Sequence, residues 1–222
     1  GKILNALEIN GFMENTMIVY TSDHGEQIGE HGLWWKQTFY ENSSRVPAII
    51  SWPGHFPEGQ VLDNAINQFD LITTMLDASN SPLLPRSNGR SLLKLLKDSE
   101  KTDWEDLAFS EYCMDDSDYF SHSGNLGGLD VHAMSGGVQN RMIRYNEFKL
   151  NYYHGFEPQL FNLKEDPNEL NDLSQNEAYK SVRKDLENKV LMNWNPDKIA
   201  NDMRVLRKET QIMQDWAKKT DP

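Results

Sequence analysis

A short apolar segment that ends in acidic residues, histidines and glycines constrains this chain more than any other feature. Residues 16–21 (TMIVYT) have the composition of a buried strand. The next residues read SDHGEQIGEHG, with glycines at 25, 29 and 32 and with five side chains of metal-ligand type within nine residues: Asp23, His24, Glu26, Glu30 and His31. The pattern predicts a strand whose carboxyl end carries a candidate metal site.

The tripeptide Asp23-His24-Gly25 is the centre of this candidate site. We expect Gly25 to supply a sharp bend that lets the two preceding side chains face one ion. The alternative is that Asp23 caps a helix or makes a turn, and that His24 is a partly buried polar residue. Lys36 follows thirteen residues after Asp23, where its ammonium could bind an anionic oxygen or remain solvated. His31 could support the ligands or only pack the loop.

The order of the remaining elements favours an α/β fold with its sites at the carboxyl ends of strands. In the first half we expect a helix already under way at Gly1, a strand at 45–52, an amphipathic helix at 67–78 and a short helix at 91–96. From residue 106 the pattern predicts a small antiparallel sheet, with strands at 107–112, 140–145, 147–153 and 159–162. Two helices follow, at 176–192 and 196–218.

A long polar loop separates the first two strands of this predicted sheet. It runs from Cys113 to Gly137, which is long for a connection without structure of its own. We expect it to line a substrate entrance, although its histidines could equally be solvated. The aromatic and imidazole side chains that support this expectation are Tyr119, Phe120, His122 and His132.

Composition excludes some partners of the chain. The 222 residues carry a formal net charge of -12, so a nucleic-acid backbone is not an expected partner. No apolar run approaches the roughly 20 residues that a spanning helix needs, and no signal segment is visible. The single cysteine, Cys113, allows no internal disulfide. The compartment is left open, the cytoplasm and the periplasm of a bacterium both being compatible with the sequence.

Several separated segments of the chain follow a shared pattern: TSDHGEQIGEHGLWWKQTFYENSSRVPAIISWPG, then NQFDLITTMLDAS with SNGRSLL, and then PQLFNLKEDPNELNDLS. Together they resemble the sulfatase family of the alkaline phosphatase superfamily. The resemblance implies an α/β fold that is the C-terminal part of an alkaline-phosphatase-like sandwich, followed by a small antiparallel sheet and C-terminal helices. Residues 1–105 would then belong to the catalytic α/β domain and residues 106–222 to the C-terminal subdomain.

The resemblance also implies roles for three side chains. Asp23 and His24 would ligate a divalent cation, most often Ca²⁺, with Mg²⁺ and Mn²⁺ as alternatives. Lys36 would bind a sulfate oxygen. The attacking group in this family is a formylglycine hydrate made from a Cys or Ser in a C-x-P-x-R context.

Departures from the family pattern are as informative as the matches. The only cysteine stands in Cys-Met-Asp-Asp-Ser, which is not that context, and the family's first acidic metal-binding pair is missing. We therefore expect the chain to be the C-terminal portion of a sulfatase, with no catalytic nucleophile of its own. The formylglycine would lie in a missing N-terminal part, which becomes an expected partner, and the chain alone is expected to be inactive.

The substrate and the wider function leave alternatives open. The segment around Glu111, the hairpin ending in EPQLFNL and the tail look similar to the choline-sulfatase branch, in which Glu111 would hold a quaternary ammonium group. Glu111 could equally be an ordinary acid at the end of a strand. Other hypotheses are hydrolysis of a phosphodiester or phosphonate monoester, and a non-catalytic assembly module. Homo-oligomer formation through the apolar stripe of the tail competes with packing on the chain's own domain. The stripe consists of Ile199, Met203, Leu206, Ile212, Met213 and Trp216.

Overall fold

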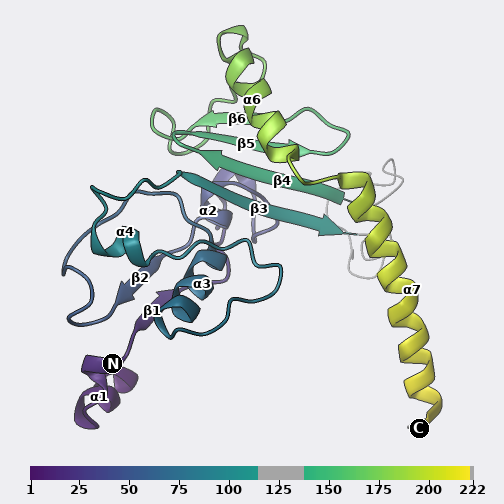
Figure 1. Ribbon diagram of the computed structural model, residues 1–222. Helices are drawn as coiled ribbons and strands as arrows, with labels where there is room; N and C mark the ends of the chain where they lie inside the picture. Colours follow the sequence, from purple (N-terminus) through teal and green to yellow (C-terminus); the bar gives the residue numbers. More distant parts are fainter. Residues whose placement is uncertain (115–137, 221–222) are drawn as a thin grey trace. The chain divides into compact units, whose positions relative to one another are not determined.

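The computed structural model describes residues 1–114 and 138–220 (Figure 1). The chain forms two compact units, Gly1–Ala108 and Phe109–Pro222. In the part of the chain that is described, no helix is both long and apolar enough to cross a membrane. The loop expected to line a substrate entrance falls on residues 115–137, so the four aromatic and imidazole side chains named for it lie outside the described residues.

The first unit combines short helices with a two-stranded antiparallel sheet. The strands are β1 (Ile18–Thr21) and β2 (Ala48–Ser51). The helices are α1 (Lys2–Ile9), α2 (Glu41–Ser44), α3 (Gln68–Ala78) and α4 (Leu93–Lys97), with 3-10 turns at Met13–Asn15 and Glu30–Gly32. Each of the expected helices is present, although α4 begins two residues later than predicted.

Strand β1 forms where the sequence predicts it, but the expectation that it is buried is wrong for this chain. Val19 and its register partner Ile50 pack against the core of the unit. Tyr20 and its partner Ile49 are 62% and 60% exposed on the other face. Among the described residues these two strands pair only with each other, and the face that carries Tyr20 and Ile49 is exposed.

Helix α3 organises the first unit because its start is capped and its buried face, Asp70, Leu71, Thr73 and Thr74, packs into the unit. Asn67 is the N-cap, and the Asp70 side chain accepts a hydrogen bond of 2.9 Å from the Asn67 amide, which closes a capping box. Leu71 then packs with Leu92 and Leu95 in the core of the unit. The polar-then-apolar pattern at 67–78 therefore predicts this helix to within one residue.

The second unit is built on a four-stranded sheet with the order β3-β4-β5-β6. The strands are β3 (Leu107–Met114), β4 (Val138–Tyr145), β5 (Phe148–Tyr153) and β6 (Gln159–Asn162). Tyr145 pairs with Phe148 across a two-residue turn, and Asn146 adopts a φ of 52° there. Asn tolerates this left-handed conformation better than most residues, so the hairpin predicted around Tyr145-Asn146 is confirmed.

Helix α6 (Lys180–Leu191) covers this sheet and closes the core of the second unit. A 3-10 turn at Glu177–Tyr179 precedes it, so the helix predicted at 176–192 is present with a tighter first turn. The core consists of side chains from the sheet, from α6 and from the residues just after it, namely Met142, Ile143, Leu150, Leu160, Phe161, Leu186, Val190 and Trp194.

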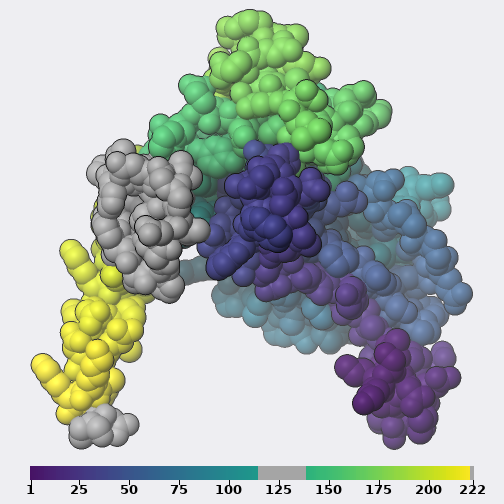
Figure 2. Space-filling model, turned by 180° about the vertical axis from the view of Figure 1, so that it is seen from behind, coloured from purple at the N-terminus to yellow at the C-terminus, as the bar shows by residue number. Residues whose placement is uncertain are grey.

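The last helix, α7 (Pro196–Thr220), is anchored to the second unit only near its start. Its buried residues are Pro196 and Ala200. Leu206, Met213 and Trp216 are 63%, 70% and 67% exposed. In Figure 2 the C-terminal part of α7 (yellow) lies away from the green surface of the sheet and α6. Most of the apolar stripe predicted for the tail is thus uncovered in the described residues, rather than packed on its own unit.

Candidate functional site

The ligand-rich loop follows β1 and is fixed by hydrogen bonds across it. The Gln27 amide donates to the Trp35 carbonyl over 2.9 Å, and the Gly29 amide donates to the Leu33 carbonyl over 2.8 Å. The Gln27 side chain is fully buried, and its Nε2 donates to Thr38 Oγ1 over 2.6 Å. The loop therefore has a defined internal structure although most of its side chains are exposed.

Several residues of this loop adopt left-handed backbone conformations. Ile28, His31 and Trp35 have φ angles of 50°, 53° and 74°. A β-branched residue at positive φ is a genuine outlier. Such conformations cost on the order of 1–3 kcal/mol each and cluster at functional sites. Three such residues therefore lie in the loop that also carries Asp23, His24 and Lys36, and two more, Asn80 and Arg86, lie elsewhere in the same unit.

Gly25 is required in this loop for a different reason from the one expected. Its φ lies outside the left-handed range, so it does not supply the sharp bend that the sequence suggested. A Cβ at this position would instead lie 2.0 Å from the Asn42 carbonyl oxygen. The Gly25 amide also donates to the Ser43 carbonyl over 2.8 Å. The glycine allows the chain after His24 to lie directly against the start of α2.

Asp23 and His24 present adjacent ligand atoms at the end of β1. Asp23 Oδ1 accepts hydrogen bonds from the His24 amide over 3.1 Å and from Ser22 Oγ over 3.4 Å. The imidazole of His24, when it is protonated, and these hydrogen bonds lower the pKa of Asp23. The carboxylate is 84% exposed, and its Oδ2 lies 3.5 Å from His24 Nε2. An ionised carboxylate and an imidazole nitrogen therefore face the same region.

The hydrogen bond made by the other ring nitrogen sets the tautomer of His24. Nδ1 lies 2.7 Å from the Gly25 carbonyl oxygen, which can only accept, so Nδ1 carries a proton. In the neutral ring Nε2 is then the free ligand atom, an arrangement typical of metal-binding histidines. Two ligand atoms 3.5 Å apart, each about 2.4 Å from a cation, subtend roughly a right angle at it. The pair fits part of a cation's coordination shell.

No further His, Cys, Asp or Glu side chain of the described part of the chain joins this pair in a metal-binding group. Across residues 1–114 and 138–220, no group of three or more His, Cys, Asp and Glu side chains could hold an ion. Glu26 and Glu30, which stand in the same sequence cluster, do not complete one. Asp23 and His24 thus form an incomplete site.

Lys36 and His31 have different positions in the loop. The Lys36 side chain is exposed, and its ammonium forms no ion pair with the described residues, while its carbonyl oxygen accepts a hydrogen bond from Ser43 Oγ. The His31 ring stacks on Tyr40 with centroids 3.9 Å apart and an interplanar angle of 9°. Of the two roles left open for His31, packing of the loop is the one that this contact supports.

Glu111 lies in the second unit, on β3, where Arg141 already pairs with it. Its Oε1 is 3.1 Å from Arg141 Nε. The Arg141 guanidinium also lies 4.1 Å from the centroid of the Phe109 ring, and its Nη1 donates to the Val190 carbonyl over 2.8 Å. Glu111 keeps 44% of its side chain exposed. Its role toward a quaternary ammonium stays a prediction, and the ion pair supports the alternative of a structural acid.

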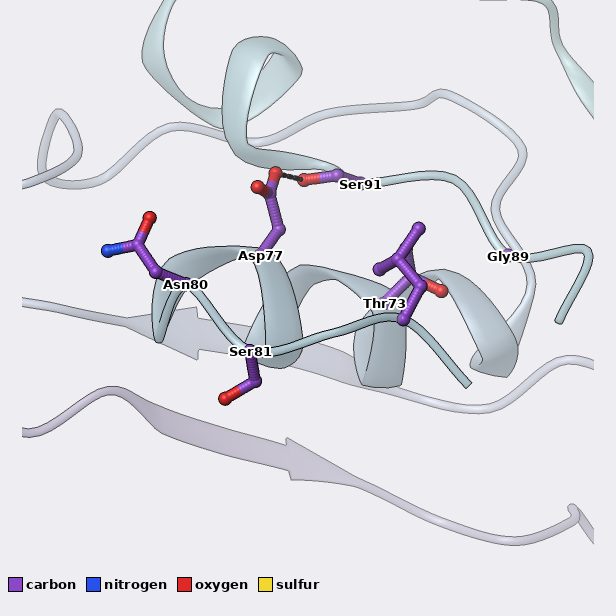
Figure 3. A pocket seen from close by; sticks show the side chains of 7 residues that line it. Thr73, Asp77, Asn80, Ser81, Gly89 and Ser91 are labelled. Carbon is purple, nitrogen blue, oxygen red and sulfur yellow. Dashed lines mark hydrogen bonds between the residues drawn. The ribbon is translucent and has the colours of Figure 1, made fainter. Parts of the chain in front are cut away.

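A pocket of about 450 Å³ lies elsewhere in the first unit (Figure 3). It runs along the C-terminal half of α3 and the segment before α4, and its lining is Thr73, Asp77, Asn80, Ser81, Leu83, Gly89 and Ser91. Its one carboxylate, Asp77, accepts a hydrogen bond from Ser91 Oγ. None of the residues of the ligand-rich loop lines it, so this hollow is separate from the candidate metal site.

One contact of the loop could not be read from the sequence. Gln68, the first residue of α3, donates hydrogen bonds from its side-chain amide to the carbonyl oxygens of Ser22 and Asp23. Nothing in the spacing of the sequence singles it out, since a polar residue after an N-cap is ordinary.

With the geometry established, comparison with known proteins identifies the class of the chain. The family described as N-sulphoglucosamine sulphohydrolase, C-terminal, matches residues 29–195. Arylsulfatase K of Canis lupus familiaris is 29% identical over 96% of this chain and 37% of its own length. The N-acetylglucosamine-6-O-sulfatase of Bacteroides thetaiotaomicron is 30% identical over 84% of this chain and 31% of its own length.

Solved structures agree with this class. A complex of a protein with its substrate D-glucosamine-2-N,6-O-disulfate has a TM-score of 0.67 and 28% identity, over 91% of this chain and 38% of the other. The phosphonate monoester hydrolase of Agrobacterium radiobacter has a TM-score of 0.70 and 29% identity, over 86% of this chain and 37% of the other. The fold is thus of the alkaline phosphatase type, as the sequence predicted.

The chain belongs to the sulfatase family, and its matched residues form the C-terminal domain of that family. It spans about a third of the length of the curated relatives described above. The family and fold predicted from the sequence are confirmed. The choline-sulfatase branch stays a prediction.

Proposed function

We propose that this chain is the C-terminal part of a metal-dependent sulfuric ester hydrolase. The observation that carries the proposal is the adjacent pair of ligand atoms, Asp23 Oδ2 and His24 Nε2, 3.5 Å apart at the end of β1. Lys36, thirteen residues after Asp23 on the same strained loop, is the proposed contact for a sulfate oxygen. Because the whole chain carries net negative charge, an anionic ester would need local positive groups, such as a bound cation and an ammonium, to be held there.

The residues of this chain would hold and orient the ester rather than attack it. A bound cation, Ca²⁺ in the first instance and Mg²⁺ or Mn²⁺ as alternatives, would supply Lewis-acid polarisation of the sulfuryl oxygens. Asp23 and His24 would hold that ion, and Lys36 would offset charge on the sulfate as the ester bond lengthens. These positive groups would also favour a bound anionic ester over solvent.

The nucleophile is proposed to be a formylglycine in an N-terminal part that this chain does not include. The only cysteine, Cys113, is half-buried on β3, and burial together with the charge of Glu111 raises the pKa of its thiol to about 11. A thiol with such a pKa is a poor nucleophile at neutral pH. By itself the chain should therefore turn over no ester.

The alcohol part of the substrate has two candidates. Choline is favoured by the resemblance around Glu111. An amino sugar is favoured by one relative, named an N-acetylglucosamine-6-O-sulfatase, and by one solved structure, which holds D-glucosamine-2-N,6-O-disulfate. The ion pair between Arg141 and Glu111 offsets the charge that a quaternary ammonium would meet, which weighs toward the sugar ester. A phosphonate monoester is the competing substrate class, supported by the hydrolase neighbour.

The proposal is tested by ester hydrolysis in the full-length protein. Release of sulfate from choline sulfate, from glucosamine 6-sulfate and from an aryl sulfate would be measured beside hydrolysis of a phosphonate monoester. We expect Asp23→Ala and Lys36→Ala to lose more than about 100-fold in kcat/KM, because the first would remove a ligand of the cation and the second the ammonium that contacts the sulfate.

Two variants serve as matched controls for this test. Asp63→Ala and Lys97→Ala remove exposed side chains of the same types in the same unit, away from the ligand-rich loop. They should keep full activity. Hydrolysis of the phosphonate ester alone would assign the chain to the competing class, and activity that survives Asp23→Ala would overturn the metal site.

A further inference from the structure

Gln68 connects helix α3 to the two residues that begin the candidate metal site. Its side-chain amide donates to the Ser22 carbonyl oxygen, and it donates to the Asp23 carbonyl oxygen over 3.3 Å. A primary amide has two N–H groups, so one side chain can serve both acceptors. The residue itself lies in the first turn of α3, 45 positions from Asp23 in the sequence. The backbone before His24 is thus held from a distant element.

The element that carries Gln68 is itself anchored. Asp70, two residues later, is fully buried and accepts from the amides of Asn67 over 2.9 Å and Arg90 over 2.7 Å. The Arg90 side chain in turn donates to the carbonyls of Glu105 and Leu107 over 2.8 Å each. Buried, charge-assisted hydrogen bonds of this kind are among the stronger ones in proteins. The first turn of α3 is therefore a fixed platform within the unit.

Holding these two carbonyls also orients the ligand side chains. The peptide group between Asp23 and His24 is planar, so fixing the Asp23 carbonyl fixes the direction of the His24 N–H. That N–H donates to Asp23 Oδ1 over 3.1 Å and so sets the rotation of the carboxylate. On the other side, the single hydroxyl hydrogen of Ser22 is shared between the His24 carbonyl oxygen, 2.9 Å from Oγ, and Asp23 Oδ1, 3.4 Å from it. The backbone and both ligand side chains form one hydrogen-bonded unit.

We propose that Gln68 is a positioning residue that holds the backbone of Ser22 and Asp23 so that Asp23 Oδ2 and His24 Nε2 face one cation. The inference rests on the proposed metal-binding function of this pair. Gln68 does not touch the cation. It holds the two ligands in place before the ion binds, so less conformational entropy is lost on binding. Removing its N–H groups should weaken cation binding without abolishing it.

The test is a Tb³⁺ titration of the full-length protein, followed by luminescence. Tb³⁺ takes oxygen-rich sites like those of Ca²⁺, and its binding is read without any turnover. Gln68→Met keeps the length of the side chain and removes both donors. We expect the dissociation constant to rise about 10-fold, the lower end for residues that orient metal ligands from behind. In ester hydrolysis, kcat should return toward the wild-type value when Ca²⁺ is raised to saturation.

Gln60→Met is the matched control, because Gln60 Nε2 donates to the Leu96 carbonyl over 2.6 Å in the same unit, away from the loop. It should leave Tb³⁺ affinity unchanged. If Gln68→Met binds Tb³⁺ like the wild type, or only lowers the melting temperature, the inference is wrong. The same holds if Gln60→Met weakens binding equally. Asp23→Ala distinguishes a failure of the inference about Gln68 from a failure of the proposed metal site: if this variant too leaves Tb³⁺ binding intact, the metal site itself is wrong.

Discussion

The buried ion pair between Lys149 and Glu169 offers the sharpest test of how the second unit is held together. Lys149 Nζ lies 2.8 Å from Glu169 Oε1, and the two side chains are 0% and 1% exposed. Lys149 stands in the middle strand β5, opposite Arg144 of β4 and Phe161 of β6. Replacing Lys149 by Met keeps most of the apolar volume and leaves the Glu169 carboxylate in the core without its cation.

The cost of that change follows from the desolvated charge. Breaking a buried pair by removing one partner destabilises a protein by about 3–5 kcal/mol. If the sheet opens as a unit, the backbone amides that exchange through this opening should do so roughly 150- to 5,000-fold faster in the variant. This follows because each 1.36 kcal/mol of lost stability is a factor of ten in the opening equilibrium. Hydrogen–deuterium exchange of the peptide that contains Phe148–Tyr153 measures this directly in the full-length protein. The double variant Lys149→Met with Glu169→Gln should recover part of the loss, because no full charge then stays buried.

Lys184→Met is the control, since Lys184 is exposed on α6 of the same unit. Surface substitutions of this kind change stability by about 0.5 kcal/mol or less. The amide exchange rates of β5 in Lys184→Met should therefore stay within about threefold of those of the wild type. Equal exchange in Lys149→Met and Lys184→Met would refute the argument that the ion pair supports the sheet.

Three further predictions concern the loop, the thiol and the tail. Gly25→Ala should weaken Tb³⁺ binding and loosen the loop to limited proteolysis, because its Cβ would lie 2.0 Å from the Asn42 carbonyl oxygen. Alkylation of Cys113 at pH 8 should be roughly 200-fold slower than that of a free thiol, and its rate should keep rising with pH toward about 11, where the raised pKa lies. Glu111→Gln should speed the alkylation, and a rate that levels off near pH 9 would contradict the burial argument. We propose that α7 joins two copies of the protein, and Leu206→Asp should then shift sedimentation from dimer to monomer, whereas an unchanged sedimentation coefficient would remove the tail from that role.

The elements that could be predicted from the sequence are those fixed by local chemistry. The capping box at Asn67 and Asp70 predicts α3, and Asn146 at the turn between β4 and β5 predicts the hairpin. The cluster at Asp23 and His24 stands at the end of a strand, as its pattern indicates. In each case the deciding residues lie within a few positions of one another, so periodicity and turn preferences suffice.

The features that could not be predicted depend on contacts between distant segments. The need for glycine at position 25 comes from the backbone of Asn42, and the link from Gln68 crosses 45 positions to reach Asp23. Lys149 reads as a solvated strand residue until Glu169, twenty positions later, is seen beside it. Such pairs leave no period in the sequence, because a single chain gives no sign of which polar residues fold together.

The left-handed residues of the ligand-rich loop have a practical consequence for protein engineering. Ile28, His31 and Trp35 hold φ angles that glycine adopts without steric cost. At Ile28 and Trp35 a glycine would relieve this strain, although glycine also adds conformational entropy to the unfolded state. At His31 the same change would also remove the ring that stacks on Tyr40. A screen for heat-resistant variants of the full-length protein should therefore find the first two positions before the third.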